Sequence, residues 1–169
     1  MLVGATRWIM RHTEHATIIG RSQRRLDRLQ GAEGAERATF VPLDYRNSVD
    51  LLLCLQDAAR VHGPIDLVAS WIHSTVPDAI AVLAEEVGRS ATAWRFIHVK
   101  GSASDLAAIR AAVLMPQGCA YRQVMLGYQH DAGRSRWLTH QEVSDGVIRA
   151  IVDDTDVTVG QLEPWSARP

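Results

Sequence analysis

The chain has 169 residues, of which 47% are hydrophobic and 22% charged, and a formal net charge of −1. This length and balance fit one soluble globular domain spanning residues 1–169 and exclude a largely disordered chain. The charge gives no electrostatic reason to expect nucleic acid as a partner.

The sequence also argues against a membrane, a metal and a disulfide framework. No apolar run approaches the ~18 residues of a membrane span, and Met1 is not followed by a secretory signal. Cys54 and Cys119 have no metal-ligand spacing, and neither do the histidines. We therefore expect a cytoplasmic protein without a metal or a membrane partner.

The first residues admit two interpretations. Residues 2–6 can form a strand and a glycine turn, but the residues left before Ala16 are few, because a whole crossover takes at least ~10–12 residues. Alternatively, Met1–His12 is a helix that presents Leu2, Ala5 and Ile9 to the sheet, with Gly4 permitting a close approach. We predict the second arrangement.

A helix at the start implies an interrupted sheet. It should follow an earlier strand and a glycine-rich phosphate loop, and the sequence has neither before Met1. In the strand order 3-2-1-4-5-6 the absent first strand lies in the middle, so two strands would face an empty slot with unpaired N–H and C=O groups. We therefore expect a chain that is short at its N-terminus, through a misassigned start codon or a deletion.

Apolar and helix-forming segments then alternate to the end of the chain. The predicted strands cover residues 16–20, 39–44, 65–72, 94–99, 121–128 and 157–162, and residues 133–135 are predicted to form a turn. Pro42 predicts an edge strand, whereas the apolar segment 65–72 predicts a central one. Asn47 or Ser48 caps one predicted helix, and Thr139 with Glu142 forms a capping box for another. The pattern predicts an α/β fold, a doubly wound, Rossmann-like, three-layer parallel sheet whose first strand is missing.

Arg21, Ser22 and Arg25 follow the strand at 16–20 and form the first candidate group. Ligands of a parallel α/β sheet bind outside the carboxyl ends of its strands. An arginine at the end of a second strand accommodates the 2′-phosphate of NADP, because its guanidinium is planar and always charged. A solvated helix start explains the same residues without a ligand.

The ends of the following strands supply the other candidates. Asp44 can accept a hydrogen bond from an adenine amino group, with Tyr45 packing nearby, or it can simply cap a helix. Trp71 and His73 follow the strand at 65–72, near the ring end of a bound dinucleotide. His73 is a candidate proton donor, because the unperturbed pKa of histidine suits work near neutrality.

Lys100 and Ser102 complete the candidates, at the end of the strand at 94–99. Lys100 is the only lysine of the chain, and it stands at a carboxyl strand end. We therefore treat it as a candidate catalytic residue.

Several of these segments resemble the short-chain dehydrogenase/reductase superfamily in order and spacing over residues 1–128. They are Ile18-Ile19-Gly20-Arg21-Ser22, Leu43-Asp44, Gly63-Pro64-Ile65-Asp66-Leu67-Val68 and Phe96-Ile97-His98-Val99-Lys100-Gly101-Ser102. The resemblance implies a Rossmann sheet, NADP or NAD as the cofactor, and hydride transfer to or from a carbonyl or hydroxyl group of a small-molecule substrate. It places Arg21 and Asp44 at the adenosine end and Ser102 or Ser104 near the catalytic serine.

The sequence departs from that family at three places. The Thr-Gly-x-x-x-Gly-x-Gly loop has no counterpart, the segment 70–73 replaces Asn-Asn-Ala-Gly, and the predicted helix 105–114 lacks the Tyr-x-x-x-Lys pair. Three hypotheses follow: an NAD(P)(H)-dependent oxidoreductase, a non-catalytic dinucleotide-binding or sensing module, and a fragment that folds only with a partner chain. Assembly into a homo-oligomer is compatible with each.

Overall fold

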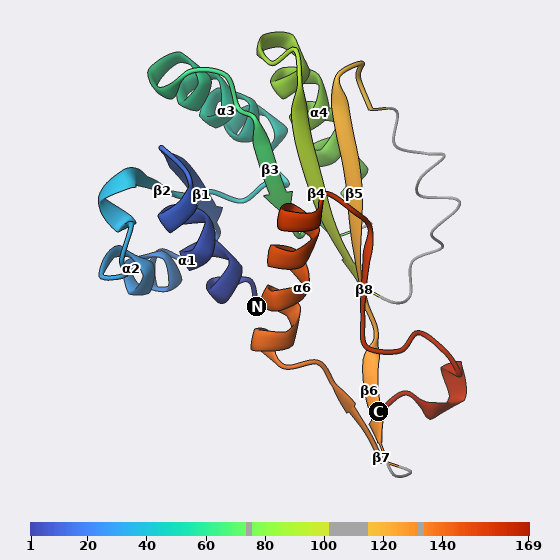
Figure 1. Ribbon diagram of the computed structural model, residues 1–169. Helices are drawn as coiled ribbons and strands as arrows, with labels where there is room; N and C mark the ends of the chain where they lie inside the picture. The colour runs from blue at the N-terminus through green and yellow to red at the C-terminus, as the bar shows by residue number, and fades with distance from the viewer. Residues whose placement is uncertain (74–75, 102–114, 132–133) are drawn as a thin grey trace.

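The computed structural model describes residues 1–73, 76–101, 115–131 and 134–169. The helices are α1 (Val3–His12), α2 (Gln23–Gln30), η1 (Ala35–Arg37), α3 (Ser48–His62), α4 (Pro77–Ser90), α6 (His140–Asp153) and η2 (Trp165–Ala167). The strands are β1 (Ala16–Gly20), β2 (Ala38–Pro42), β3 (Leu67–Ser70), β4 (Trp94–Gly101), β5 (Cys119–Leu126), β6 (Tyr128–Asp131), β7 (Arg134–Trp137) and β8 (Val157–Val159). Ser102, Ser104 and the predicted helix 105–114 lie outside the described residues (Figure 1).

The parallel strands form two separate sections. β1 pairs with β2, and β3, β4, β5 and β8 form a four-stranded sheet in that order. Across the molecule, the strands follow the order β2-β1 and then, after an interruption, β3-β4-β5-β8 (Figure 1). This is the order of a doubly wound sheet with a gap in its middle. The predicted fold class and the predicted slot are confirmed. Pro42 lies in the edge strand β2 as expected, but β3 is an edge of the larger section, so the prediction of a central strand there is wrong.

The predicted N-terminal helix is confirmed as α1. It buries Ala5 and Met10. Its last turn carries basic residues, whose positive charge interacts favourably with the negative end of the helix dipole. Gly4 does permit a close approach, but to α6 rather than to the sheet. A Cβ atom at Gly4 would lie 2.9 Å from the Cβ of Ser144.

Helices cover both faces of the strands. On one face, α1 and α6 pack over a cluster that contains Ile97, Val99 and Val124. On the other face, α3 and α4 pack together over a cluster that contains Phe96. Alternate residues of β4 thus serve opposite faces, and β4 is buried along nearly its whole length. No helix among the described residues is long and apolar enough to cross a membrane.

The hairpin β6–β7 is a feature that sequence reasoning missed. The predicted strand 121–128 ends at Leu126, and Tyr128 begins β6. Gly127 lies so close to the chain at Gln161 that a Cβ there would stand 2.0 Å from the Gln161 carbonyl oxygen. The predicted turn at 133–135 is wrong for Arg134 and Ser135, which belong to β7, because antiparallel pairing with β6 extends that far.

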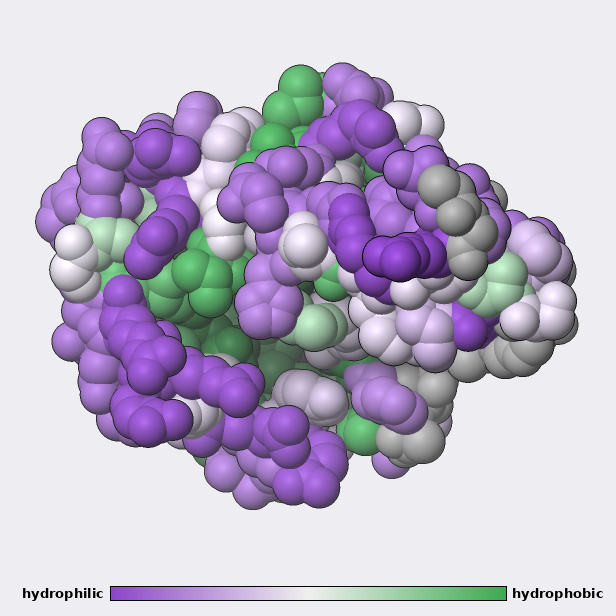
Figure 2. Space-filling model, turned by 90° about the horizontal axis from the view of Figure 1, so that it is seen from below, coloured by the Kyte–Doolittle hydropathy of each residue, from purple (hydrophilic) through white to green (hydrophobic). Residues whose placement is uncertain are grey.

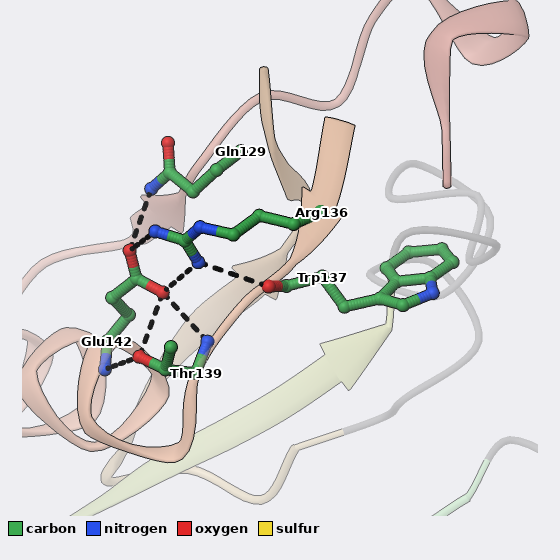
Figure 3. Close-up of polar contacts among 5 residues, drawn as sticks. All are labelled: Gln129, Arg136, Trp137, Thr139 and Glu142. Carbon is green, nitrogen blue, oxygen red and sulfur yellow. Dashed lines mark hydrogen bonds and ion pairs between the residues drawn. The ribbon is translucent and has the colours of Figure 1, made fainter. Parts of the chain in front are cut away.

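A capping box joins the hairpin to α6 (Figure 3). The backbone N–H of Glu142 donates to Thr139 Oγ1 at 3.2 Å, and the N–H of Thr139 donates to Glu142 Oε2 at 2.7 Å. Arg136 in β7 donates to both Glu142 carboxylate oxygens at 2.9 Å, and Gln129 in β6 donates to Oε1 at 3.3 Å. One carboxylate therefore holds the helix start and both hairpin strands.

We expect Glu142→Gln to destabilise the protein mainly near neutral pH. Hydrogen bonds from Arg136 and Thr139 lower the pKa of Glu142 from 4.5 to about 2. A carboxyl whose pKa is lower in the folded state adds stability above its unfolded pKa, and this stability is lost as the pH falls from about 4.5 to about 2. Urea unfolding of both proteins at pH 7 and pH 3 should show a difference that shrinks at the lower pH. An equal difference at both values would contradict this.

Candidate functional site

The carboxyl ends of β1 and β2 bring two candidate residues together. Gly20 is paired with Pro42, and the N–H of Leu43 donates to the Gly20 carbonyl at 3.1 Å. The residues that follow, Arg21 and Asp44, are close enough for the Arg21 charge to act on the Asp44 carboxylate. Arg21 and Asp44, which the family resemblance placed at the adenosine end, are therefore neighbours at this edge of the sheet.

Asp44 is held in its ionised form by Arg46. The Arg46 Nε donates to both Asp44 carboxylate oxygens, at 3.0 and 2.9 Å, and the Arg46 backbone N–H donates to Oδ1 at 3.1 Å. These hydrogen bonds, with a smaller contribution from Arg21, lower the pKa of Asp44 to about 2. Sequence reasoning missed Arg46, although an arginine two residues after an acid at a strand end was a readable signal.

Ser22 and Arg25 stand at the start of α2. The Ser22 carbonyl accepts from the N–H groups of Arg25 and Leu26, while its side chain makes no capping hydrogen bond. The charge of Arg25 acts on the Met1 amino group, whose pKa is lowered chiefly by burial and then by this arginine. Arg25 thus lies near the start of α1, whereas Arg21 lies near Asp44, at the carboxyl end of β2.

Trp71 and His73 follow β3, on the other side of the interruption in the sheet. Trp71 is half-buried against the α1 and α6 cluster, whereas His73 is exposed and its carbonyl accepts from the N–H of Val76 at 3.0 Å. Tyr45, which follows β2, is half-buried and packs against the α3 and α4 cluster. The candidates therefore lie along one edge but belong to both sections of the sheet.

Lys100 points into the protein. Its side chain is 5% exposed, and its Nζ lies 5.7 Å from the centre of the Tyr121 ring, over the ring face. Nζ is buried without a hydrogen-bond partner among the described residues. Burial lowers the pKa of this amine from 10.5 to about 8.

Lys100 belongs to a buried polar cluster that sequence reasoning missed. His98, two residues earlier on the same face of β4, has its Nδ1 2.8 Å from the hydroxyl of Tyr121, and Gln123 Nε2 donates to that hydroxyl at 3.5 Å. Burial, and then the Lys100 charge, lower the pKa of His98 to about 4, so its imidazole is neutral at pH 7. The alternation of polar residues at 98 and 100 and at 121 and 123 was a usable signal, but only strand register shows that the two pairs meet.

The described residues thus place the exposed guanidinium group of Arg21 beside the ion pair of Asp44 and Arg46, with the imidazole of His73 after β3. Among these residues, no group of three or more histidine, cysteine, aspartate or glutamate side chains is placed to hold a metal ion. Ser102, the remaining candidate, lies outside the described part of the chain.

No protein-family model and no curated protein matches this chain. Solved structures do match it. An enoyl-(acyl-carrier-protein) reductase from Anaplasma phagocytophilum in complex with NAD matches with a TM-score of 0.69 at 14% identity, over 93% of this chain and 84% of that one.

Two further structures match over a similar length. They are a gluconate 5-dehydrogenase from Burkholderia cenocepacia in complex with NADP and tartrate, and a mutant short-chain dehydrogenase/reductase from Serratia marcescens. The first has a TM-score of 0.64 at 14% identity, over 94% of this chain and 88% of that one. The second has a TM-score of 0.69 at 11% identity, over 94% and 91% of the two chains. The chain therefore has the Rossmann-like fold of the short-chain dehydrogenases/reductases.

Proposed function

We propose that this protein binds NADP(H), with NAD as a weaker alternative, across the carboxyl ends of its parallel strands. The observation that carries the proposal is the convergence of Arg21 with the Asp44–Arg46 pair at the ends of two neighbouring strands. A ligand of a doubly wound sheet lies in the crevice outside these ends, and an arginine there accommodates a 2′-phosphate.

The chemistry of this corner suits the adenosine end of the cofactor. Arg21 is exposed, so its guanidinium group can reach a phosphate dianion and bind it with charge-assisted hydrogen bonds, whereas the Arg46 guanidinium is paired with Asp44. The Asp44 carboxylate stays ionised at neutral pH and can accept from the adenine amino group, with Tyr45 beside it. Ser22 and Arg25 supply further donors at the start of α2.

The ring end of the cofactor would then lie toward Trp71 and His73. We propose an oxidoreductase that transfers a hydride to or from a carbonyl or hydroxyl group of a small molecule, with the exposed His73 as the candidate for the proton transfer. Two of the similar structures were solved with NAD and with NADP bound, which supports this proposal.

Arg21→Ala should weaken NADPH binding roughly 10- to 100-fold, because a hydrogen bond to a charged group contributes about 1.5–3 kcal/mol. NADH binding should change less than about threefold, because NADH has no 2′-phosphate. Titrations followed by nicotinamide fluorescence measure both. The control is Arg24→Ala, which removes another exposed arginine, three residues after Arg21. Equal loss for NADPH and NADH, or an equal effect of the control, would contradict the assignment.

A non-catalytic binding module is the second candidate, and the position of Lys100 favours it. The only lysine of the chain is buried under Tyr121 instead of lining the strand-end edge. Saturable NADPH binding without oxidation of NADPH by a panel of aldehydes and ketones would favour the module. Turnover that His73→Ala abolishes would favour the oxidoreductase.

A further inference from the structure

The described arginines differ in whether the protein supplies a partner for them. Most form an ion pair with an acid or donate to a backbone carbonyl, as Arg60 does with Asp57 and Arg89 with Glu85. The side chains of the others have no ion pair or hydrogen bond with a described residue. Apart from Arg134, all of these lie between residues 7 and 28: Arg7, Arg21, Arg24, Arg25 and Arg28. Arginines without a partner are thus concentrated in α1, α2 and the turn that precedes α2.

Arg24, Arg25 and Arg28 form one stripe on the exposed side of α2. Residues three and four apart in a helix are neighbours on its surface, so Arg28 stands next to both of the others. The two leucines of α2 are buried, whereas all three arginines are exposed. Asp27, the acid of this helix, accepts from Gln23 Nε2 at 2.7 Å and forms no ion pair with a described arginine. Seen from below, hydrophilic residues predominate along the edge of the molecule where Figure 1 places α2 (Figures 1 and 2).

α1 lies beside α2 and adds Arg7 to this surface (Figure 1). The charge of Arg25 acts on the Met1 amino group, just before α1. Near the end of α1, Arg11 forms an ion pair with Glu33, in the segment that follows α2, at 3.6 Å. Arg7 precedes Arg11 by one helical turn and therefore stands on the same side of α1. We define the α1–α2 arginine surface as the exposed residues Arg7, Arg24, Arg25 and Arg28.

These positions are electrostatically unfavourable for the protein alone. Like charges three or four residues apart in a helix repel each other, and no acid in α2 compensates for them. The first turn of α2 contains Arg24 and Arg25 and no acidic residue, although the positive end of the helix dipole favours negative charge there. An anion placed on the surface reverses the sign of both effects. The arrangement therefore indicates a partner with several negative charges.

The composition of the surface distinguishes between kinds of polyanion. A protein partner needs an apolar core in the interface, and a membrane needs apolar side chains that enter it. Between residues 3 and 30, all of which are described, Val3 is the only exposed large apolar side chain. A single-stranded nucleic acid needs aromatic side chains on which its bases stack, and Trp8, the only tryptophan, tyrosine or phenylalanine of this range, is half-buried. A nucleic acid duplex keeps its bases inside and its phosphates outside, so it fits this surface better than the other three.

We propose that the α1–α2 arginine surface binds the phosphate backbone of a nucleic acid duplex without reading its sequence. The guanidinium group matches phosphate, because its planar fork donates two parallel hydrogen bonds. The net charge of −1 gives no reason to expect such a partner, but it does not describe how the structure gathers the unpaired arginines on one side. The proposal is independent of the proposed cofactor, because Arg7, Arg24 and Arg28 take no part in that site.

Fluorescence anisotropy of a labelled DNA duplex of about 20 base pairs, titrated with the full chain, tests the proposal. Each phosphate that an arginine neutralises releases counterions, and the slope of log K against log salt concentration is about −0.9 per phosphate. Contacts from four arginines therefore predict a slope of about −3.6 and roughly 100-fold weaker binding at 200 mM than at 50 mM salt. The double variant Arg24→Gln and Arg28→Gln should reduce the slope to about −1.8 and weaken binding at 50 mM salt roughly tenfold or more.

The matched control is the double variant Arg60→Gln and Arg89→Gln, which removes the same charge from exposed arginines that are paired with acids. Its duplex affinity should stay within about twofold of the unmodified protein, because net charge is not the cause of binding. NADPH binding by the Arg24 and Arg28 variant should also be unchanged, which separates this surface from the cofactor site.

Four results would overturn the proposal. They are undetectable duplex binding at 50 mM salt, equal losses in the two double variants, an unchanged salt dependence in the Arg24 and Arg28 variant, and tighter binding of another polyanion. The comparison probes for the last are polyglutamate, a single strand of the same sequence, and vesicles of phosphatidylserine and phosphatidylcholine in equal parts. Preference for one of them would assign the surface to an acidic protein, a single-stranded nucleic acid or a membrane.

Discussion

Phe96→Ala is expected to lower the free energy of unfolding by about 3–5 kcal/mol, the range for removing a buried phenylalanine side chain from a core. Phe96 is 0% exposed in the middle of β4. Its ring centre lies 5.3 Å from that of His98 and 5.5 Å from that of Tyr121. The loss combines the transfer of a large apolar group with a cavity that rigid neighbours cannot fill.

Thermal and urea unfolding measure this loss, and Phe40→Ala is the matched control. The chain contains only these two phenylalanines, and Phe40 is half-buried in the edge strand β2. We expect the control to lose less than half as much. For a chain of this size, the Phe96 variant should melt about 10 °C lower than the unmodified protein. Similar losses for the two variants would show that β4 is not the centre of the core.

Lys100→Met should stabilise the protein at pH 7. The substitution removes a buried amine that has no hydrogen-bond partner among the described residues and keeps a side chain of similar length. Burial disfavours the charged form of this amine and lowers the pKa of Lys100 from 10.5 to about 8. Lys100→Arg, which keeps the charge, should be no more stable than the unmodified protein.

The same substitution should change the dependence of stability on pH. The folded-state pKa of Lys100 lies below the unfolded value, so the unfolded chain binds more protons between about pH 8 and pH 10.5. Stability rises with pH wherever the unfolded state binds more protons, so the unmodified protein should gain stability across this interval. The cost of the buried charge is fully present below pH 8. Urea titrations at pH 7, 9 and 10 should show that the methionine variant lacks the gain, and a variant less stable at pH 7 would contradict the assignment.

Features that depend on near neighbours in the chain were readable from the sequence. The Asn47 cap is confirmed, because its side chain accepts from the N–H groups of Val49 and Asp50. The capping box at Thr139 and Glu142 is confirmed in full. The helix α1 and the interrupted sheet were also predicted, because residues before Ala16 are too few for a strand and a crossover.

Features that depend on distant residues were not readable in this way. The sequence pattern predicts the end of one strand and a turn where the structure has the hairpin β6–β7, because nothing local marks the close approach of Gly127 to Gln161. The candidate site likewise contains one part that the sequence indicates and one part that depends on distant residues. The family resemblance placed Arg21 and Asp44 at the same end of the site, and they are close to each other in the structure. The burial of Lys100 under Tyr121 depends on the register of β4 on β5.

The sequence by itself determined the alternation of strands and helices and the helix caps, since hydrophobic period and capping act over a few residues. The tertiary structure decided which side chains meet. Strand register and helix contact join residues far apart in the chain, so they brought His98 to Tyr121, Arg136 to Glu142 and Gly4 to Ser144. The same packing left the backbone edges of β1 and β3 facing the interruption without strand partners among the described residues.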